Sequence, residues 1–443
     1  MSQLPKGWAK AKLPQFAEII MGQSPASSDC NDIGDGIPFF QGKAEFQELY
    51  PEVRKYCTKP KKLAQKDDIL LSVRAPVGPT NLAPAKCSIG RGLSAIRAYE
   101  QADRYLLLYL RSIEPWTSQQ GTGSTFKAIS GQFLKDLEVR VAPLAEQSRI
   151  VEKLDEVLAQ VDTIKVRLDG IPAILKRFRQ SVLASAVSGK LTEEWRGECA
   201  EDTSWKQITL KEAAHIQDPH PSHRTPPVVE DGIPFVSIGD LREDGSIDIE
   251  NARKVSPDVL KEHNARYTLK EGDFIFGKIG TLGKATVLPI GVDFALSANV
   301  ILIQPEISLA DPKYIQYFLS SPTTMEEVAK QANSTSQAAF GIKKMRAFVC
   351  SLPKKSEQKE IVRLVDQYFA FAYTIEAQVK KAQARVDKLT QSILAKAFRG
   401  ELVAQDPNDE PADKLLERIA AARAEAEALA KTAKKVGRKQ ATA

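Results

Sequence analysis

The sequence has few of the residues that build metal centres and disulfide frameworks. Its 4 histidines and 5 cysteines are scattered, and the cysteines form no C-x-x-C pair of the kind found in zinc or redox motifs. We therefore expect reduced, mostly buried thiols. His220 and His223 share the segment DPHPSHRTPP, which is predicted to be a solvent-exposed loop because a metal site would need further ligands nearby. We predict that this chain holds no metal.

The sequence also lacks the apolar runs that address a protein to a membrane. No run approaches the ~20 residues of a membrane span, and the opening MSQLPKGWAKAKL has no apolar core like that of a secretory signal. We expect a cytoplasmic protein with no membrane partner. The chain carries 62 basic and 56 acidic residues, a formal net charge of +6. This weakly basic balance permits a nucleic-acid partner without requiring one.

Catalytic motifs are absent as well. An adenine methyltransferase would need a tetrapeptide of the D/N-P-P-Y kind and a glycine-rich cofactor loop, and the pair Pro226-Pro227 lacks both flanking residues. The segment GKIGTLGKAT (277–286) has Lys278 where a phosphate-binding loop needs glycine. There is no helicase motif set and no Ser-His-Asp or Cys-His arrangement. We predict that the chain is not an enzyme and that it binds no cofactor itself.

What the chain does contain is an internal repeat. PLAEQSRIVEKLDEVLAQVDTI, beginning at 143, aligns with PKKSEQKEIVRLVDQYFAFAYTI, beginning at 353. From Glu146 onward the offset is constant at 211, and it extends through QSVLASAVSGKL (180–191) and QSILAKAFRGEL (391–402). A repeat at one register over more than forty residues indicates duplication.

The segments before these copies repeat more weakly. Trp8 matches Trp205, Asp68 matches Asp273, GIPFF (36–40) matches GIPFV (232–236), and LSA (93–95) is aligned with LSA (296–298). The offset drifts here, as it does when loops differ in length. We therefore predict a first variable domain at 1–142, a helical spacer at 143–199, a second variable domain at 200–352, a second spacer at 353–420 and a basic Ala/Glu/Lys-rich tail at 421–443.

Periodicity predicts an α+β fold. Short β-prone runs such as DILLSV and DFIFGK, punctuated by glycine and proline, indicate two mixed α/β domains. Each spacer has apolar residues at alternating spacings of four and three, the heptad pattern of a coiled coil. The predicted seam positions, which also serve partner docking, are Ile150, Leu154, Val157, Val161, Ile164, Leu168, Leu175, Phe178, Ile361, Val365, Tyr368, Ile375, Val379, Val386, Leu389 and Ile393.

If the two helices pack on each other antiparallel, the chain forms a rod with an approximate two-fold axis. The alternative, in which each helix packs on its own domain, stays open. Pro172 should kink or bend the first helix. A pseudo-two-fold protein can dock two copies of one partner, and two domains at a fixed separation can read two DNA patches across a gap.

Loops that differ between the halves are the natural candidates for DNA contact. Arg74, in SVRAPVG, and Lys278, in GKIGTLG, stand at comparable positions after β-prone runs, and arginine commonly reads guanine. Polar loops and nearby lysines could bind phosphate or base edges. These further candidates are Ser124, Thr125, Lys127, Ser334, Thr335, Lys343 and Lys344.

The paired elements PLAEQSRIVEKLDE with QSVLASAVSGKL and SEQKEIVRLVDQ with QSILAKAFRGEL, together with LPKGWAKAKL and GSTFKAIS, resemble the specificity subunits of type I restriction-modification enzymes. The resemblance implies that each variable domain recognises one half of a split, asymmetric DNA target. It implies that the helices set the gap and bind two methyltransferase subunits that use S-adenosylmethionine. It further implies two motor-nuclease restriction subunits that use ATP and magnesium.

A different interpretation is a symmetric scaffold whose domains bind proteins and whose helices merely pair. Both interpretations fit a duplicated chain without catalytic motifs. They differ in DNA binding, because a DNA-recognition subunit has an affinity for DNA that falls with salt and a protein scaffold does not.

Overall fold

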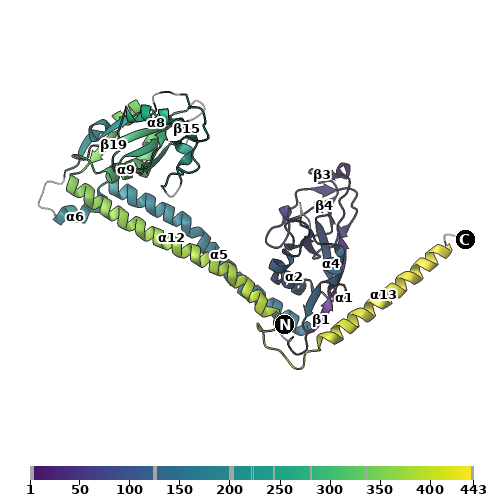
Figure 1. The fold of residues 1–443 in the computed structure, drawn as a ribbon. Coiled ribbons are helices and arrows are strands. Elements are labelled where there is room, and N and C mark those ends of the chain that lie inside the picture. The colour runs from purple at the N-terminus through teal and green to yellow at the C-terminus, as the bar shows by residue number, and fades with distance from the viewer. Residues whose placement is uncertain are drawn as a thin grey trace. The chain divides into compact units, whose positions relative to one another are not determined.

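The computed structural model describes residues 4–122, 127–198, 204–220, 222, 224–242, 245–279, 282–334 and 338–440. The chain forms two compact units, Met1–Leu168 with Ala382–Ala443 and Asp169–Lys381. Each unit holds one mixed α/β domain and a segment of each of two long helices, as Figure 1 shows. The α+β class predicted from the sequence is confirmed.

The domain of the first unit is built on two sheets. One has the strand order β2-β10-β7-β8 and the other β3-β5-β4-β9-β6, while β1 pairs separately with β11. The strands are β1 (Ala9–Lys12), β2 (Ala17–Met21), β3 (Cys30–Asn31), β4 (Ile37–Phe40), β5 (Tyr56–Cys57), β6 (Leu63–Ala64), β7 (Ile69–Ser72), β8 (Thr80–Leu82), β9 (Cys87–Ile89), β10 (Leu93–Ala98) and β11 (Glu138–Val141). Its main helices are α1 (Leu13–Phe16), α2 (Asp103–Ser112), α3 (Glu114–Thr117) and α4 (Gly131–Asp136).

The domain of the second unit repeats this plan. Its four-stranded sheet has the order β13-β19-β16-β17, a second sheet has the order β15-β14-β18, and β12 pairs with β22. The strands are β12 (Lys206–Thr209), β13 (Ala214–Gln217), β14 (Ile233–Val236), β15 (Lys254–Val255), β16 (Phe274–Gly277), β17 (Gly283–Val287), β18 (Ala295–Leu296), β19 (Val300–Pro305), β20 (Asn333–Ser334), β21 (Ala338–Ala339) and β22 (Val349–Leu352). The helices are α7 (Leu210–Ala213), α8 (Pro257–Asn264), α9 (Pro312–Ser320), α10 (Pro322–Gln331) and α11 (Ile342–Ala347).

An inner strand of each four-stranded sheet separates two apolar cores. On β10, Ile96 belongs to the large core that α2 covers, while Leu93 and Ala95 belong to a smaller core beneath the second sheet. On β19, Ile301 and Ile303 face one core while Val300 and Leu302 face another. Successive side chains of a strand point to opposite faces, so the apolar runs LSAIRA and VILIQP each serve two cores.

Buried polar contacts fasten each domain to its long helix in the same way in both halves. The indole of Trp8 donates to Glu146 at 3.0 Å, and the indole of Trp205 donates to Glu357 at 3.0 Å. The hydroxyl of a buried tyrosine on α2 or α9 donates to a backbone carbonyl near β11 or β22. Because equivalent residues make these contacts, the halves share one scaffold despite their divergent sequences.

The long helices are α5 (Leu144–Val187) and α12 (Lys355–Ala397). Pro172 lies inside α5, which stays helical there, although proline removes one backbone donor. In the first unit Lys165 pairs with Asp387 at 3.3 Å, and in the second Arg179 pairs with Glu376 at 2.9 Å. Higher numbers on α5 meet lower numbers on α12, which confirms antiparallel pairing.

Most of the predicted seam residues are buried or half-buried. Ile150, Leu154 and Ile393 lie in the core of the first unit, and Ile361 and Val365 lie in that of the second. The further buried seam residues are Val161, Leu175 and Val379, and the half-buried ones are Val157, Leu168, Phe178, Ile375 and Val386.

Three predicted seam residues are exposed instead: Ile164 (47%), Tyr368 (40%) and Leu389 (46%). A helix with 3.6 residues per turn drifts from a 3.5-residue repeat, so a heptad stripe leaves the contact line at intervals. The Tyr368 ring still packs edge-on against Phe178, with ring centroids 6.0 Å apart.

A last helix, α13 (Ala412–Gln440), begins before the predicted tail. Its first turns bury Ala412, Leu415 and Ile419 in the core of the first unit. Arg423 donates to the carbonyl of Pro14 at 2.7 Å and lies over the ring of Tyr99. Short helices η3 (Lys190–Thr192) and α6 (Glu193–Glu198) follow α5. In the part of the chain that the structure describes, no helix has the length and apolar character to cross a membrane.

Candidate nucleic-acid interface

A polar hollow of about 240 Å³ lies on the first domain. Three loops form it: the loop after β4 supplies Gln41 and Lys43, the loop after β7 supplies Arg74, and the turn between β9 and β10 supplies Arg91. All four of these side chains are exposed. The hollow therefore gathers cationic and amide groups from segments far apart in the sequence, which is the chemistry of a surface that recognises nucleic acid.

The arginines of the hollow differ from the other arginines of this domain. Arg74 and Arg91 have no hydrogen bond or ion pair from their guanidinium groups to any residue that the structure describes. The other arginines of the domain each donate to a carboxylate or a carbonyl: Arg54, Arg97, Arg104, Arg111 and Arg140. The two arginines thus line one hollow, and neither guanidinium group is engaged by a residue that the structure describes.

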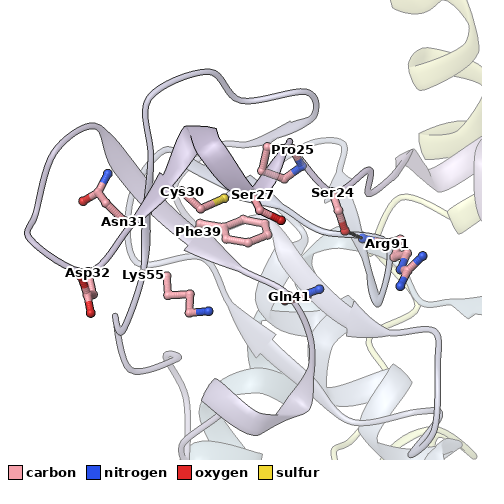
Figure 2. A pocket seen from close by; sticks show the side chains of 10 residues that line it. All are labelled: Ser24, Pro25, Ser27, Cys30, Asn31, Asp32, Phe39, Gln41, Lys55 and Arg91. Carbon is pink, nitrogen blue, oxygen red and sulfur yellow. Dashed lines mark hydrogen bonds between the residues drawn. The ribbon is translucent and has the colours of Figure 1, made fainter.

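A second pocket of about 540 Å³ adjoins the hollow and shares Gln41 and Arg91 with it. Figure 2 shows Arg91 and Ser24 at one end, Asn31 and Asp32 at the other, and Lys55 and Gln41 between them. The backbone amide of Arg91 donates to Ser24 Oγ at 3.3 Å. The pocket extends the polar surface beyond the arginines.

Lys127 lies next to the loop that carries Arg74. Its carbonyl accepts a hydrogen bond from the amide of Ala75 at 2.9 Å, and Arg74 forms a β-bridge with Ala128. The side chain of Lys127 is exposed. The structure therefore brings together two of the residues predicted from the sequence, Arg74 and Lys127.

The predicted equivalence of Arg74 and Lys278 is wrong by one residue. The amide of Val73 donates to the Gly92 carbonyl and the carbonyl of Val73 accepts from Ile129. In the other half, the backbone amide of Lys278 donates to the Asn299 carbonyl, and the Lys278 carbonyl accepts from the amide of Phe340. Lys278 therefore stands where Val73 stands, and Arg74 corresponds to Ile279.

This shift changes what Lys278 does. Its side chain is 12% exposed, and its ammonium group pairs with Asp218 Oδ2 at 2.7 Å. Val73 is buried at the equivalent position of the first domain. Lys278 is thus engaged inside the second domain, and the structure gives no support to its predicted contact with DNA.

Lys43, which lines the hollow, and Lys127, which lies beside Arg74, also have uncharged equivalents. Lys43 corresponds to Ile238, because the carbonyls of these residues accept equivalent turn hydrogen bonds from Phe46 and Leu241. Lys127 corresponds to Ala338, since the next residues form the equivalent bridges Arg74–Ala128 and Ile279–Ala339.

Arg91 corresponds to Ala298, because equivalent turn hydrogen bonds run from Leu93 to Gly90 and from Val300 to Ser297. The alignment of LSA (93–95) with LSA (296–298) was therefore wrong by four residues. In the correct register Leu93 matches Val300. Arg91 is then a position where the halves differ, although it is not among the candidates predicted from the sequence.

A cation of the adjoining pocket is kept in both halves. The amide of Phe39 donates to the Lys55 carbonyl at 2.8 Å, and the amide of Phe235 donates to the Arg253 carbonyl at 2.7 Å. Lys55 and Arg253 are therefore equivalent, and both side chains are exposed. The sequence does not reveal this pair, because the matching segments GIPFF and GIPFV are separated from Lys55 and Arg253 by stretches that do not match.

Lys343 and Lys344 lie elsewhere on the second domain. They line a cavity of about 680 Å³ together with Phe318, Phe348 and Val349, and the Lys344 ammonium donates to the Gln331 carbonyl. Ser334 belongs to β20. The predicted candidates Ser124, Thr125 and Thr335 lie outside the described residues.

The prediction of a solvent-exposed loop is wrong for His220, which is 5% exposed. Its Nδ1 lies 2.9 Å from Nε2 of His263, whose Nδ1 lies 2.9 Å from the Tyr267 hydroxyl. Burial, reinforced by the neighbouring charges of His220 and Arg266, lowers the pKa of His263 to about 4. His223 lies outside the described residues. Where the chain is described, no group of three or more candidate ligands could hold a metal.

Together these features define a duplicated recognition protein, in which one scaffold occurs twice and carries different side chains on equivalent loops. A family model described as "Type I restriction modification DNA specificity domain" matches residues 5–173 and again residues 203–383. The chain belongs to this family. Family membership makes it a specificity subunit rather than a catalytic one, as the sequence predicted.

Curated relatives have the same character along almost the whole chain. The specificity subunit of the type I restriction enzyme EcoKI from Escherichia coli (strain K12) is 32% identical over 95% of this chain and 97% of its own length. That of EcoBI from Escherichia coli is 31% identical over 94% and 92%. A crystal structure of the HsdS subunit from Thermoanaerobacter tengcongensis matches 90% of this chain and 98% of its own with a TM-score of 0.55. At 18% identity, this last likeness shows the shared fold.

Proposed function

We propose that the chain recognises a bipartite, asymmetric DNA sequence, with each domain reading one half. The observation that carries this proposal is the hollow of the first domain with the adjacent Lys127. There Lys43, Arg74, Arg91 and Lys127 stand at the positions of Ile238, Ile279, Ala298 and Ala338 in the second domain. Two copies of one scaffold with different side chains on equivalent loops are suited to two different half-sites.

In this proposal the paired helices α5 and α12 set the gap between the half-sites and dock two methyltransferase subunits. Both helices expose apolar side chains that a partner would cover, including Val166 and Ile174 on α5 and Phe371 on α12. Exposed apolar side chains on helices are typical of protein interfaces. Two restriction subunits complete the proposed complex.

The cofactors belong to the partners. S-adenosylmethionine would be bound by the methyltransferase subunits, and ATP and magnesium by the restriction subunits. The chain itself contributes the DNA contacts and the spacing between them. The complex would work in the cytoplasm, where the host DNA is.

Methylation mapping tests the proposal. The chain is co-expressed with the neighbouring methyltransferase subunit, and adenine methylation is mapped across the host genome by single-molecule sequencing. We expect a split motif with a constant gap. Replacing residues 200–352 with the corresponding domain of a relative should change one half of the motif and leave the other.

Two outcomes would contradict the proposal. If the subunits co-purify and no motif appears, the chain acts as a scaffold without sequence-specific recognition. If the domain exchange changes both halves of the motif together, the two domains do not read separate half-sites. Affinity for DNA that does not fall with salt would also favour the scaffold.

A further inference from the structure

We propose that Arg74 and Arg91 read guanine in the half-site of the first domain, and that Lys55 and Arg253 hold DNA phosphates in both domains. This inference rests on the proposed function and deepens it, because it separates base-reading positions from positioning ones. It also assigns the first half-site at least one G·C pair.

The first step is the availability of the two guanidinium groups. Arg74 and Arg91 line one hollow, are exposed, and have no partner among the described residues. An arginine that serves the fold normally donates to a carboxylate or a carbonyl, as Arg97 does to Asp68 at 2.8 Å. A free guanidinium can donate two parallel hydrogen bonds to O6 and N7 of guanine in the major groove.

The second step is that the backbone holds Arg91 in place. It lies between Gly90 and Gly92, which pack against the backbone of Gln41 so tightly that a Cβ on Gly92 would come within 2.2 Å of the Gln41 carbonyl oxygen. A Cβ on Gly90 would come within 3.2 Å of Gln41 Cα. The Ser24 hydroxyl accepts from the Arg91 amide. A preorganised turn of this kind loses little conformational freedom on binding.

The third step is the contrast between positions that differ and the position that is kept. Phosphates are the same in every sequence, so a cation that contacts phosphate serves both domains equally. Lys55 and Arg253 have this property. Base edges differ between half-sites, so base-reading side chains differ between the domains, as Arg74 differs from Ile279 and Arg91 from Ala298.

The second domain has a different reading surface at these positions. Ile238, Ile279 and Ala298 are half-buried and present apolar groups. Apolar side chains contact the methyl group of thymine rather than the acceptors of guanine. Guanine in the second half-site therefore has no arginine reader at the positions equivalent to Arg74 and Arg91.

The test uses the full complex and the methylation map. Arg74→Ala and Arg91→Ala should each relax one G·C position of the first half-site, with discrimination falling by roughly 5-fold to 150-fold. The other half of the motif should be unchanged. Arg74→Lys and Arg91→Lys keep the charge without the planar fork, so they should relax the same position while leaving non-specific DNA affinity close to that of the wild type.

Lys55→Ala and Arg253→Ala should behave in the opposite way. Each should weaken binding to all sequences and reduce the salt slope by about 1, with the motif unchanged. Arg54→Ala is the matched control, because Arg54 is an exposed arginine of the same domain that pairs with Glu52 at 2.7 Å. It should alter neither the motif nor the slope.

The inference is overturned if the first half-site contains no G·C pair, or if the alanine variants co-purify with their partner and keep full discrimination. It is also overturned if Lys55→Ala changes the motif. Failure of the proposed function would look different, because the wild-type complex would then give no split motif.

Discussion

The two recognition domains have the same interior and different exposed loops. Equivalent tryptophans donate to equivalent glutamates, and the four-stranded sheets have the same strand order. At the polar hollow, by contrast, the cations of the first domain have uncharged residues at the equivalent positions of the second domain. Residues that hold each domain on its helix are thus kept, while the residues proposed to meet DNA are free to change without cost to the fold.

The largest effect is expected when the first domain is given the second domain's residues at the four equivalent positions in and beside the hollow. The variant Lys43→Ile, Arg74→Ile, Arg91→Ala and Lys127→Ala should bind the cognate DNA on the order of 10³-fold more weakly, because it loses two proposed base contacts and two cations. Fluorescence anisotropy over a range of salt concentrations measures this. The reciprocal exchange in the second domain should steepen its salt dependence; an unchanged slope in both would show that the hollow does not meet DNA.

The next largest effect is a loss of unfolding free energy when a buried glutamate is replaced, and it should differ between the two domains. Glu357 is 1% exposed and accepts from Trp205, Thr192 and Arg196. Glu357→Gln leaves Arg196 without its charged partner and should cost about 3 kcal/mol of unfolding free energy. Glu146 accepts a hydrogen bond from the Trp8 indole, and the amide oxygen of a glutamine can accept the same bond. Burial raises the pKa of Glu146, so its charged form is less favoured there.

Glu146→Gln should therefore cost less than about 1 kcal/mol. Hydrogen exchange in increasing denaturant reports on the two domains separately. If the two glutamine variants lose the same unfolding free energy, the predicted difference between the buried glutamates is wrong.

Acidification should also separate the domains. All the histidines lie after residue 214, and burial lowers the pKa of His263 from 6.5 to about 4. Between these values the unfolded chain binds more protons than the folded one, so stability rises with pH and is lost as pH falls from 6.5 toward 4.

Thermal unfolding at pH 7.5 and pH 5.0 should show this loss in the second domain. His263→Asn should lower stability at pH 7.5 but weaken the pH dependence, because asparagine does not titrate in this range. A pH dependence as steep as that of the wild type would mean that another group is responsible.

The smallest effect concerns the buried tyrosines. The Tyr105 hydroxyl donates to the Arg140 carbonyl and accepts from the Ala142 amide, whereas the Tyr314 hydroxyl donates to the Ser351 carbonyl. Tyr105→Phe leaves the buried amide of Ala142 without an acceptor, so we expect it to lower the unfolding free energy by about 2 kcal/mol. Tyr314→Phe should lower it by about 1 kcal/mol. Denaturant midpoints measure both losses, and a larger loss at 314 would contradict this ranking.

The architecture was predictable because the repeat is strongest in the helices. An insertion in a helix rotates every later side chain, so α5 and α12 keep a constant offset of 211. Loops accept insertions, and the offset drifts through the domains. Because of this drift, Lys278 was aligned with Arg74, although it stands at the position equivalent to the buried Val73. A register error of one residue assigns a side chain to the opposite face.

Other parts of the site needed contacts that sequence alone does not show. His220 is buried because His263, far along the chain, meets it, and no local pattern marks that pair. Arg91 lies in a short glycine turn that has no hydrophobic periodicity. It becomes a candidate only because the fold brings it to the same hollow as Gln41 and Arg74. Arg74, in a loop that follows an apolar β-prone run, was predictable from its own surroundings.

The docking of α13 on the first domain bears on how the protein is made. Ala412, Leu415 and Ile419 complete a core whose other residues begin at Trp8, while the second unit is one continuous stretch, Asp169–Lys381. During translation the second domain can therefore close its core before synthesis ends. The first domain leaves the ribosome earlier, but part of its core stays uncovered until the last helix emerges, and apolar surface that is exposed during synthesis favours aggregation.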